Sequence, residues 1–180
     1  MKIFKYALLF ILFVFVGGII ALLFAPSSHS YSNTIQINQP LAVVYGSYLD
    51  TSLMPMWLTN VKTVSPLDSN YGQKGSKADI IYAEADKKVD ARQEVVKVVE
   101  DSAINLVRHL KDELSLHVDA SFVSVNPTTT QISLESKIEL HKWILKVVMF
   151  KSGEPMKNRT DDELNAFKKI LESSSFQAKI

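Results

Sequence analysis

The sequence predicts an α+β protein: an antiparallel sheet with a long C-terminal helix, preceded by one transmembrane helix. Three observations predict it. Residues 6–25 form an apolar, uncharged segment long enough to cross a bilayer. Residues 61–140 divide into alternating apolar and polar runs separated by short turns, and residues 160–171 carry apolar side chains at helical spacing. These observations favour a single domain held at a membrane.

The N-terminal segment predicts where the domain lies. A helix of about 20 apolar residues spans the roughly 30 Å hydrocarbon layer of a membrane. Lys2 and Lys5 precede the segment, so the positive-inside tendency places the N-terminus in the cytoplasm and the domain on the periplasmic or extracellular side. The alternative is a cleaved signal peptide, whose apolar region usually has about 7–15 residues. Residues 24–27 make a poor cleavage site, so we expect an uncleaved, single-pass signal anchor at 1–25.

The rest of the chain has the size of one domain. We expect a short linker at 26–30 and a domain at 31–180. Lys2 and Lys5 lie at the start of the anchor, so the rest of the chain has 18 of the 20 Lys and Arg residues. Against 19 Asp and Glu residues, this part of the chain has a net charge of −1. No basic stripe is present, which argues against nucleic acid as a partner. The chain has no cysteine, which excludes disulfides, a thiol nucleophile and thiolate metal ligands.

The first elements of the domain are a strand and two short helices. Residues 31–37 alternate polar and apolar side chains and predict a strand. Pro40 suits a first helical turn, and residues 41–49 follow with helical spacing. Residues 50–52 are candidates to cap a second short helix, which carries Met54, Met56 and Trp57.

Six further strands are then expected, at residues 61–67, 76–85, 88–100, 103–113, 114–125 and 130–140. Turn-forming residues separate them, and such short connections predict an antiparallel meander. One strand alternates clearly. Its apolar face is predicted to contain Leu114, Leu116, Val118, Ala120 and Phe122. A sheet with one buried face and one solvated face produces this pattern.

The chain is predicted to end in a capped helix. Thr160 is a good N-cap, and Glu163 three residues later completes a capping box. The apolar stripe of this helix consists of Leu164, Phe167, Ile170 and Leu171. The inner face of the sheet is the surface on which we expect this stripe to pack.

This order of elements resembles the helix-grip fold of the START-related superfamily, in particular its polyketide cyclase/dehydrase-like branch. The resemblance rests on residues 35–45, on residues 54–57 and on the terminal helix. It implies a curved antiparallel sheet wrapped around the long C-terminal helix. It also implies a cavity between sheet and helix for a hydrophobic or amphipathic small molecule or lipid.

No catalytic signature accompanies this fold. The sequence has no His-Glu-x-x-His, no Gly-x-Ser-x-Gly and no phosphate-binding or dinucleotide-binding glycine motif. His117 and Asp119 form only a weak surface pair. We therefore expect no metal and no cofactor, and we favour a binding domain. A cyclase- or hydrolase-like enzyme and a structural protein without a ligand are the alternatives.

The candidate cavity residues are mostly aromatic. Arg108 and His109 are adjacent in one strand and so point to opposite faces, which makes one of them a candidate polar anchor inside the cavity. Trp57 and Tyr82 line the cavity or fill the core. Residues 142–151 form either a mobile loop or short helix over the cavity mouth, with a composition that also suits a bilayer interface, or the continuation of the last strand into the core. The full candidate set is Trp57, Tyr82, Tyr48, Met54, Arg108, Phe122, Trp143 and Phe167.

Overall fold

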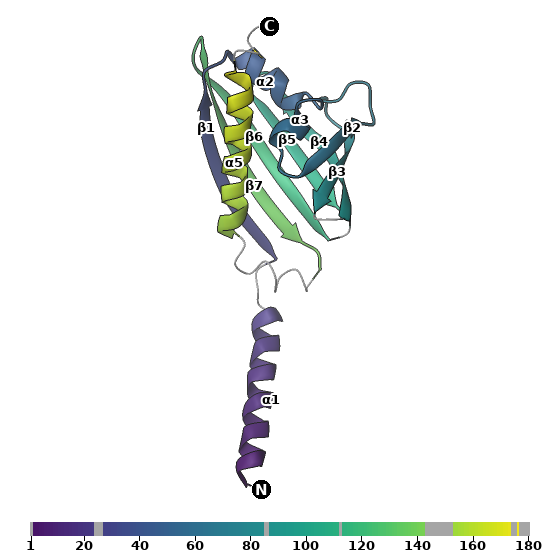
Figure 1. Ribbon diagram of the computed structural model, residues 1–180, viewed down its shortest axis with the longest axis vertical. Helices are drawn as coiled ribbons and strands as arrows, with labels where there is room; N and C mark the ends of the chain where they lie inside the picture. The colour runs from purple at the N-terminus through teal and green to yellow at the C-terminus, as the bar shows by residue number, and fades with distance from the viewer. Residues whose placement is uncertain are drawn as a thin grey trace.

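The computed structural model describes residues 2–23, 27–84, 87–111, 113–142, 153–173 and 176 (Figure 1). Every predicted strand is present, with bounds that differ from the predicted ones by at most three residues. The helices are α1 (Lys2–Leu23), α2 (Leu41–Leu49), α3 (Met54–Trp57) and α5 (Gly153–Leu171). The strands are β1 (Ser28–Ile37), β2 (Val61–Pro66), β3 (Lys77–Glu84), β4 (Lys87–Val99), β5 (Ala103–Leu110), β6 (Leu114–Asn126) and β7 (Thr129–Leu140).

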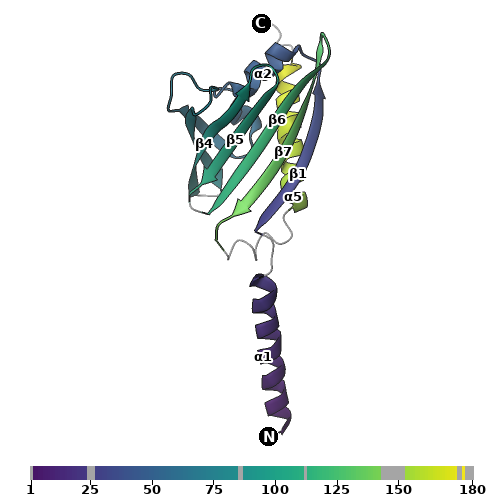
Figure 2. The same cartoon turned by 180° about the vertical axis from the view of Figure 1, so that it is seen from behind.

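All seven strands join one antiparallel sheet in the order β1-β7-β6-β5-β4-β3-β2. The predicted meander is confirmed for β2 to β7, because each of these strands pairs with its neighbour in sequence. The first strand closes the other edge by pairing with the last, from Ser28–Glu139 to Ile37–Thr130. Seen from behind, β4, β5, β6, β7 and β1 form one continuous surface without a covering helix (Figure 2).

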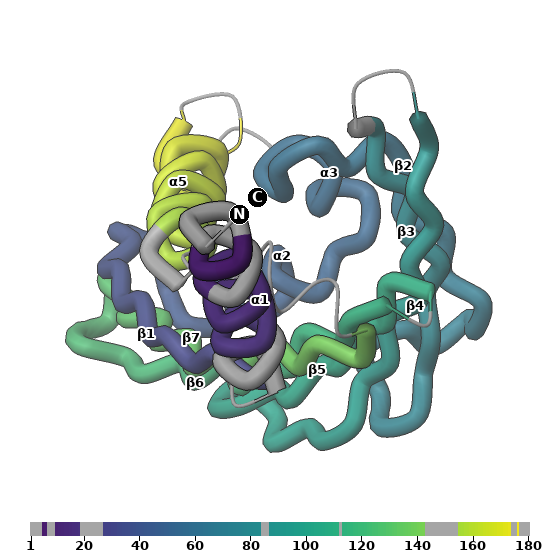
Figure 3. Tube along the Cα trace, turned by 90° about the horizontal axis from the view of Figure 1, so that it is seen from below, coloured from purple at the N-terminus to yellow at the C-terminus, as the bar shows by residue number. Residues whose placement is uncertain are grey.

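The sheet is strongly curved, and the helices of the domain lie inside its curve (Figure 3). Alternation along the strands decides which side chains point inward. On β6, Ala120 and Phe122 are buried, whereas Asp119 and Ser121, which alternate with them, are exposed. The fully buried residues Phe167 and Leu171 of α5 join Ile37 and Ile132 of the sheet in one hydrophobic core. The predicted docking of the terminal helix on the inner face is confirmed.

The predicted start of the terminal helix is wrong. Helix α5 begins at Gly153, seven residues before Thr160, so Thr160 lies inside the helix and caps nothing. Its hydroxyl is 3.4 Å from the hydroxyl of Tyr31 on β1. Glu163 turns away from the helix start and accepts a hydrogen bond from the backbone N–H of Thr59 at 2.9 Å. Pro155 in the first turn is compatible with the earlier start, because proline lacks only an N–H that a first turn leaves unbonded.

Two smaller predictions are also corrected. The residue before α3 is Leu53, which makes no side-chain cap, and the carboxylate of Asp50 instead accepts bonds from the Ser52 backbone N–H and hydroxyl at 2.8 and 2.6 Å. The Asp50 carboxylate, which was expected to cap the helix, is used in this local turn instead. At the other end, β1 already begins at Ser28, so most of the predicted linker belongs to the sheet.

Helix α1 projects from the end of the domain at which β1 begins (Figure 1). A search of the described residues identified no helix with the length and apolarity required to span a bilayer. The transmembrane span expected at residues 6–25 stays a prediction.

Candidate functional site

Arg108 points to the inner, concave side of the sheet. It follows Ile104 and Leu106 on the same face of β5, and both of these are buried in the core. Its cross-strand partner on β6 is Leu116, which belongs to the apolar face of that strand. His109 therefore lies on the opposite, outer face, where it is exposed. Of the two adjacent candidates, Arg108 is the one that the fold directs toward the helices, and its side chain is half-buried there.

Side chains from two neighbouring strands hold the guanidinium. Nη1 of Arg108 donates to the hydroxyl of Tyr82 on β3 at 2.8 Å. Nε and Nη2 both donate to Oε1 of Gln93 on β4, at 3.1 and 2.5 Å. Nε2 of Gln93 in turn donates to the hydroxyl of Tyr71, in the loop before β3. We call Arg108, Tyr82, Gln93 and Tyr71 the arginine network.

The direction of each bond in this network follows from Arg108. A guanidinium only donates hydrogen bonds, so the Gln93 oxygen must face it and the Gln93 amide group must face Tyr71. Both Tyr71 and Tyr82 therefore act as acceptors, and their own hydroxyl protons remain unused. Among the described residues, neither proton has an acceptor. The network thus presents donors without acceptors.

Among the described residues, no carboxylate forms an ion pair with Arg108. In the described part of the chain, the arginine ion pairs within 4.0 Å are Arg92–Asp79 and Arg159–Glu163. Burial lowers the pKa of Arg108, but the nearby phenols and the more distant charge of Glu163 offset this and leave the pKa above its usual value. Glu163 is itself engaged by Arg159 and by the backbone of Thr59.

Four of the predicted aromatic and apolar residues form a single cluster above the network. The Tyr48 ring lies 5.5 Å from that of Trp57 and 5.3 Å from that of Phe122, and the Trp57 ring lies 5.0 Å from that of Phe167. Met54, only 2% exposed, belongs to the same core. These residues fill the space between sheet and helix with their own contacts, as a core does. The remaining candidate, Trp143, lies outside the described residues.

One buried polar atom of this cluster has no hydrogen-bond partner among the described residues. The indole Nε1 of Trp57 is buried and has no hydrogen-bond acceptor among the described residues. Burial raises the pKa of the Tyr48 phenol, an effect that the charge of Arg108 opposes. Buried donors of this kind usually find a partner, so each one without an acceptor requires an explanation.

Among the described residues, the inner face is buried at one end, which we call the closed end of the grip, and partly exposed at the other, which we call the open end. Toward the turn between β6 and β7, Phe122 and Ile132 are 3% and 0% exposed. Toward the turn between β5 and β6, Leu110, Leu116 and Val118 are half-buried on the same face. Arg108 lies among these half-buried residues. The arginine network therefore borders the open end of the grip.

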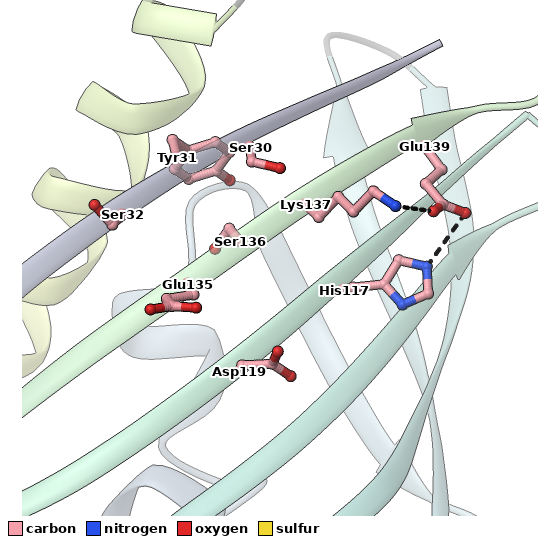
Figure 4. Close-up of a pocket in the computed structure, with 9 residues that line it drawn as sticks. All are labelled: Ser30, Tyr31, Ser32, His117, Asp119, Glu135, Ser136, Lys137 and Glu139. Carbon is pink, nitrogen blue, oxygen red and sulfur yellow. Dashed lines mark ion pairs between the residues drawn. The ribbon is translucent and has the colours of Figure 1, made fainter.

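The outer face carries a different kind of depression, with a volume of about 650 Å³ (Figure 4). Its lining includes charged side chains, three of which pair: Glu139 contacts Lys137 at 2.7 Å and His117 at 3.5 Å. The hydrogen bond and the charge of Lys137 hold the pKa of Glu139 below its usual range. Asp119 accepts a hydrogen bond from Asn105. It does not form the surface pair with His117 that the sequence predicted. An open, charged surface of this kind does not suit an apolar ligand.

One serine on the outer face contacts two histidines. The hydroxyl of Ser115 lies 2.9 Å from Nδ1 of His109 and 2.8 Å from Nε2 of His141. Ser115 is only 3% exposed, which leaves little room for a substrate to approach its oxygen. Within the described residues, no group of three or more His, Asp or Glu side chains is placed to hold a metal ion.

Sequence reasoning missed Gln93 and Tyr71. Gln93 is 1% exposed and lies between Ala91 and Val95 on the inner face of β4. A polar side chain at the centre of an apolar face is a detectable signal, because a buried amide needs partners. Tyr71 had no such signal, because it lies in a turn whose path depends on the whole fold.

Comparisons with known proteins address the fold. No protein-family description matches the chain, and no curated protein matches it in sequence. Solved structures do match. A conserved protein from Geobacillus kaustophilus has a TM-score of 0.65 at 14% identity, over 78% of this chain and 93% of that one. The chain has a START-like helix-grip fold.

Two further structures illustrate the range of proteins with this fold. Ara h 8.0201 matches with a TM-score of 0.61 at 10% identity, over 78% of this chain and 95% of that chain. Norcoclaurine synthase from Thalictrum flavum, in complex with dopamine and hydroxybenzaldehyde, matches with a TM-score of 0.60 at 10% identity. That match covers 83% of this chain and 91% of the synthase. At these identities the likeness concerns the helix-grip fold alone.

Proposed function

We propose that this helix-grip domain binds a hydrophobic or amphipathic small molecule between the sheet and α5, at the open end of the grip. The observation that carries the proposal is the gradient of burial along the inner face. Phe122 is buried at one end, whereas Leu110, Leu116 and Val118 at the other end keep part of their apolar surface exposed. Ligand sites are typically apolar with a few placed polar groups, which is the composition of this end.

The comparison with norcoclaurine synthase supports a ligand without identifying it. That structure holds dopamine and hydroxybenzaldehyde on the same fold. General acid–base catalysis most often uses a histidine or a carboxylate placed beside the ligand. The polar groups of the arginine network are a guanidinium, an amide and two phenols, and Glu163 is already engaged by Arg159. We therefore favour binding over a cyclase- or hydrolase-like activity.

The second part of the proposal concerns the membrane. We propose that residues 6–25 hold the domain to a bilayer as a single-pass anchor, with the N-terminus cytoplasmic and the domain on the periplasmic or extracellular side. The support is the apolar sequence of this segment and the exposure of its side chains: Phe10 is 68% and Phe13 77% exposed. Such exposure of large apolar side chains favours contact with lipid or a partner.

The short connection between α1 and β1 places the open end of the grip at the same end of the domain as α1. Leu23 ends α1 and Ser28 begins β1, so these positions are at most about 18 Å apart. Ser28 pairs with Glu139, whose partner on β6 is Ser115, near the turn that borders the open end. On this proposal the open end of the grip faces the bilayer, from which an apolar ligand can enter directly.

Ligand binding is tested with the full chain in dodecyl maltoside and decan-1-ol as the probe. A ligand that binds only the folded state raises the urea midpoint of unfolding, and the rise grows with the ratio of ligand concentration to Kd. Leu116→Trp should fill the open end and abolish the rise, whereas Val123→Trp, on the exposed outer face of the same strand, should keep it. No rise in the unsubstituted chain, at any decanol concentration below the onset of general denaturation, refutes the binding proposal.

Anchoring is tested separately. A C-terminal reporter that is active only outside the cytoplasm should be active when fused to this chain, and the chain should stay with membranes through a carbonate wash. Recovery of the full-length chain in a soluble fraction would refute the anchor.

A further inference from the structure

The open end of the grip offers more hydrogen-bond donors than the protein can use. A guanidinium has five N–H groups, and Arg108 uses three of them on Gln93 and Tyr82. The hydroxyl protons of Tyr71 and Tyr82 have no acceptor among the described residues, because both oxygens accept bonds from the network. A half-buried site with a positive charge and unused donors is complementary to an anion.

The same site is apolar on its other sides. Arg108 stands between Leu106 and Leu110 along β5 and opposite Leu116 on β6. An inorganic anion would leave this apolar surface exposed, and a neutral hydrocarbon would leave the donors unused. A molecule with an anionic head and an apolar tail satisfies both.

We propose that the arginine network is the head-group site for an anionic, single-chain amphiphile, with its carboxylate or phosphate on Arg108 and its tail along the apolar inner face at the open end. The inference deepens the proposed function and rests on it. Arg108 is assigned the charged contact, and Tyr82 and Tyr71 are assigned hydrogen bonds from their free hydroxyl protons. Gln93 is a positioning residue, because it orients Arg108 and Tyr71 through bonds of its own.

Glu163 does not replace such a ligand. It is the carboxylate whose charge acts on Arg108 through space, yet its Oε1 accepts bonds from Thr59 N–H at 2.9 Å and Arg159 Nε at 3.1 Å. It therefore serves the contact between α5 and the segment after α3. The residue leaves the donors of Arg108, Tyr71 and Tyr82 available.

The experiment compares four probes on the full chain in dodecyl maltoside, at a pH where carboxylates are ionised. Decanoate and decyl phosphate carry the anionic head and the tail, decan-1-ol carries the tail alone, and inorganic phosphate carries the charge alone. Affinities are taken from the rise in the urea midpoint with probe concentration. We expect decanoate or decyl phosphate to bind about 10- to 100-fold more tightly than decanol, the range of one hydrogen-bonded charge pair.

Arg108→Gln should abolish this preference, so that decanoate and decyl phosphate bind no more tightly than decanol to the variant. The matched control is Arg92→Gln, which removes the same charge from the exposed outer face, where Arg92 pairs with Asp79. This control should keep the preference. If the Arg108 variant does not fold, Tyr82→Phe provides the test, with a preference for the anion that falls about 3- to 10-fold.

Three other results would each refute a different part of the proposal. Equal binding of decanol and both anionic amphiphiles would refute the head-group site and leave the proposed ligand function standing. Binding of inorganic phosphate as tight as that of decyl phosphate would refute the role of the tail. Failure of all four probes would refute the proposed function itself.

Discussion

Gln39 holds the C-terminal end of helix α5 from a position 132 residues away in the sequence. Its Nε2 donates to the backbone oxygen of Leu171 at 2.7 Å, and the bond is buried. The backbone oxygen of Gln39 accepts a bond from the Thr130 hydroxyl at 2.9 Å. One turn after β1 thus joins the last turn of the long helix to the first residues of β7. These hydrogen bonds hold the C-terminal end of α5 at the closed end of the grip, away from the arginine network.

Gln39→Ala tests this fastening. The change leaves the buried oxygen of Leu171 without its donor, so the free energy of unfolding should fall by about 1–3 kcal/mol. Urea unfolding followed by circular dichroism measures the change. Gln36→Ala is the matched control, because Gln36 makes its bond to Gln131 on the exposed face. Gln39→Ala should therefore lower the free energy of unfolding more than Gln36→Ala does. A similar loss in both variants would contradict the role of the buried bond.

Phe167→Ala tests the packing of α5 on the sheet. The ring is fully buried between Tyr48 and Trp57, so its loss should lower the free energy of unfolding by about 3–5 kcal/mol. Lys169→Ala on the exposed side of the same helix should change it by no more than about 0.5 kcal/mol. A negligible effect of Phe167→Ala in urea unfolding would contradict the docked helix.

Thr160→Ala distinguishes a helix cap from an interior position. A lost N-cap costs about 1 kcal/mol, whereas alanine is a good helix former inside a helix. Because α5 begins at Gly153, we expect the substitution to change the free energy of unfolding by less than about 0.5 kcal/mol. A loss near 1 kcal/mol would indicate that the helix starts at Thr160 after all.

Alkaline pH should destabilise the domain through its buried phenols. Burial raises the pKa of Tyr48 and Tyr71 above their ordinary value of 10.0. The unfolded chain then releases these protons first as the pH rises past about 10, so it binds fewer protons than the folded state and stability falls. Tyr48→Phe should make the fall between about pH 9 and pH 11 smaller, as measured by urea midpoints at both pH values. An equal fall in both proteins would rule out Tyr48 as a contributor.

Much of the architecture was determined by the sequence itself. The alternation from Leu114 to Phe122 fixes which face of β6 is buried, because successive side chains of a strand point to opposite sides. The same rule showed that Arg108 and His109 point apart. Short turns between the strands predicted the meander, and the stripe containing Phe167 predicted the docked helix. These features depend on neighbours in sequence, which a reader of the sequence can see.

Only the tertiary structure decided which residues meet. Arg108 contacts Tyr82 and Gln93 because β3, β4 and β5 are adjacent and in a particular register, which alternation alone does not specify. The sequence showed that one of two residues points inward, and the buried face of β5, with Ile104 and Leu106 in the core, decided that it is Arg108. The capping box at Thr160 was wrong because residues before Thr160 also belong to α5, where Asn33 of β1 donates to the backbone oxygen of Lys157 at 3.0 Å. Local patterns specify elements and faces, whereas contacts between distant residues depend on the register and curvature that the complete fold supplies.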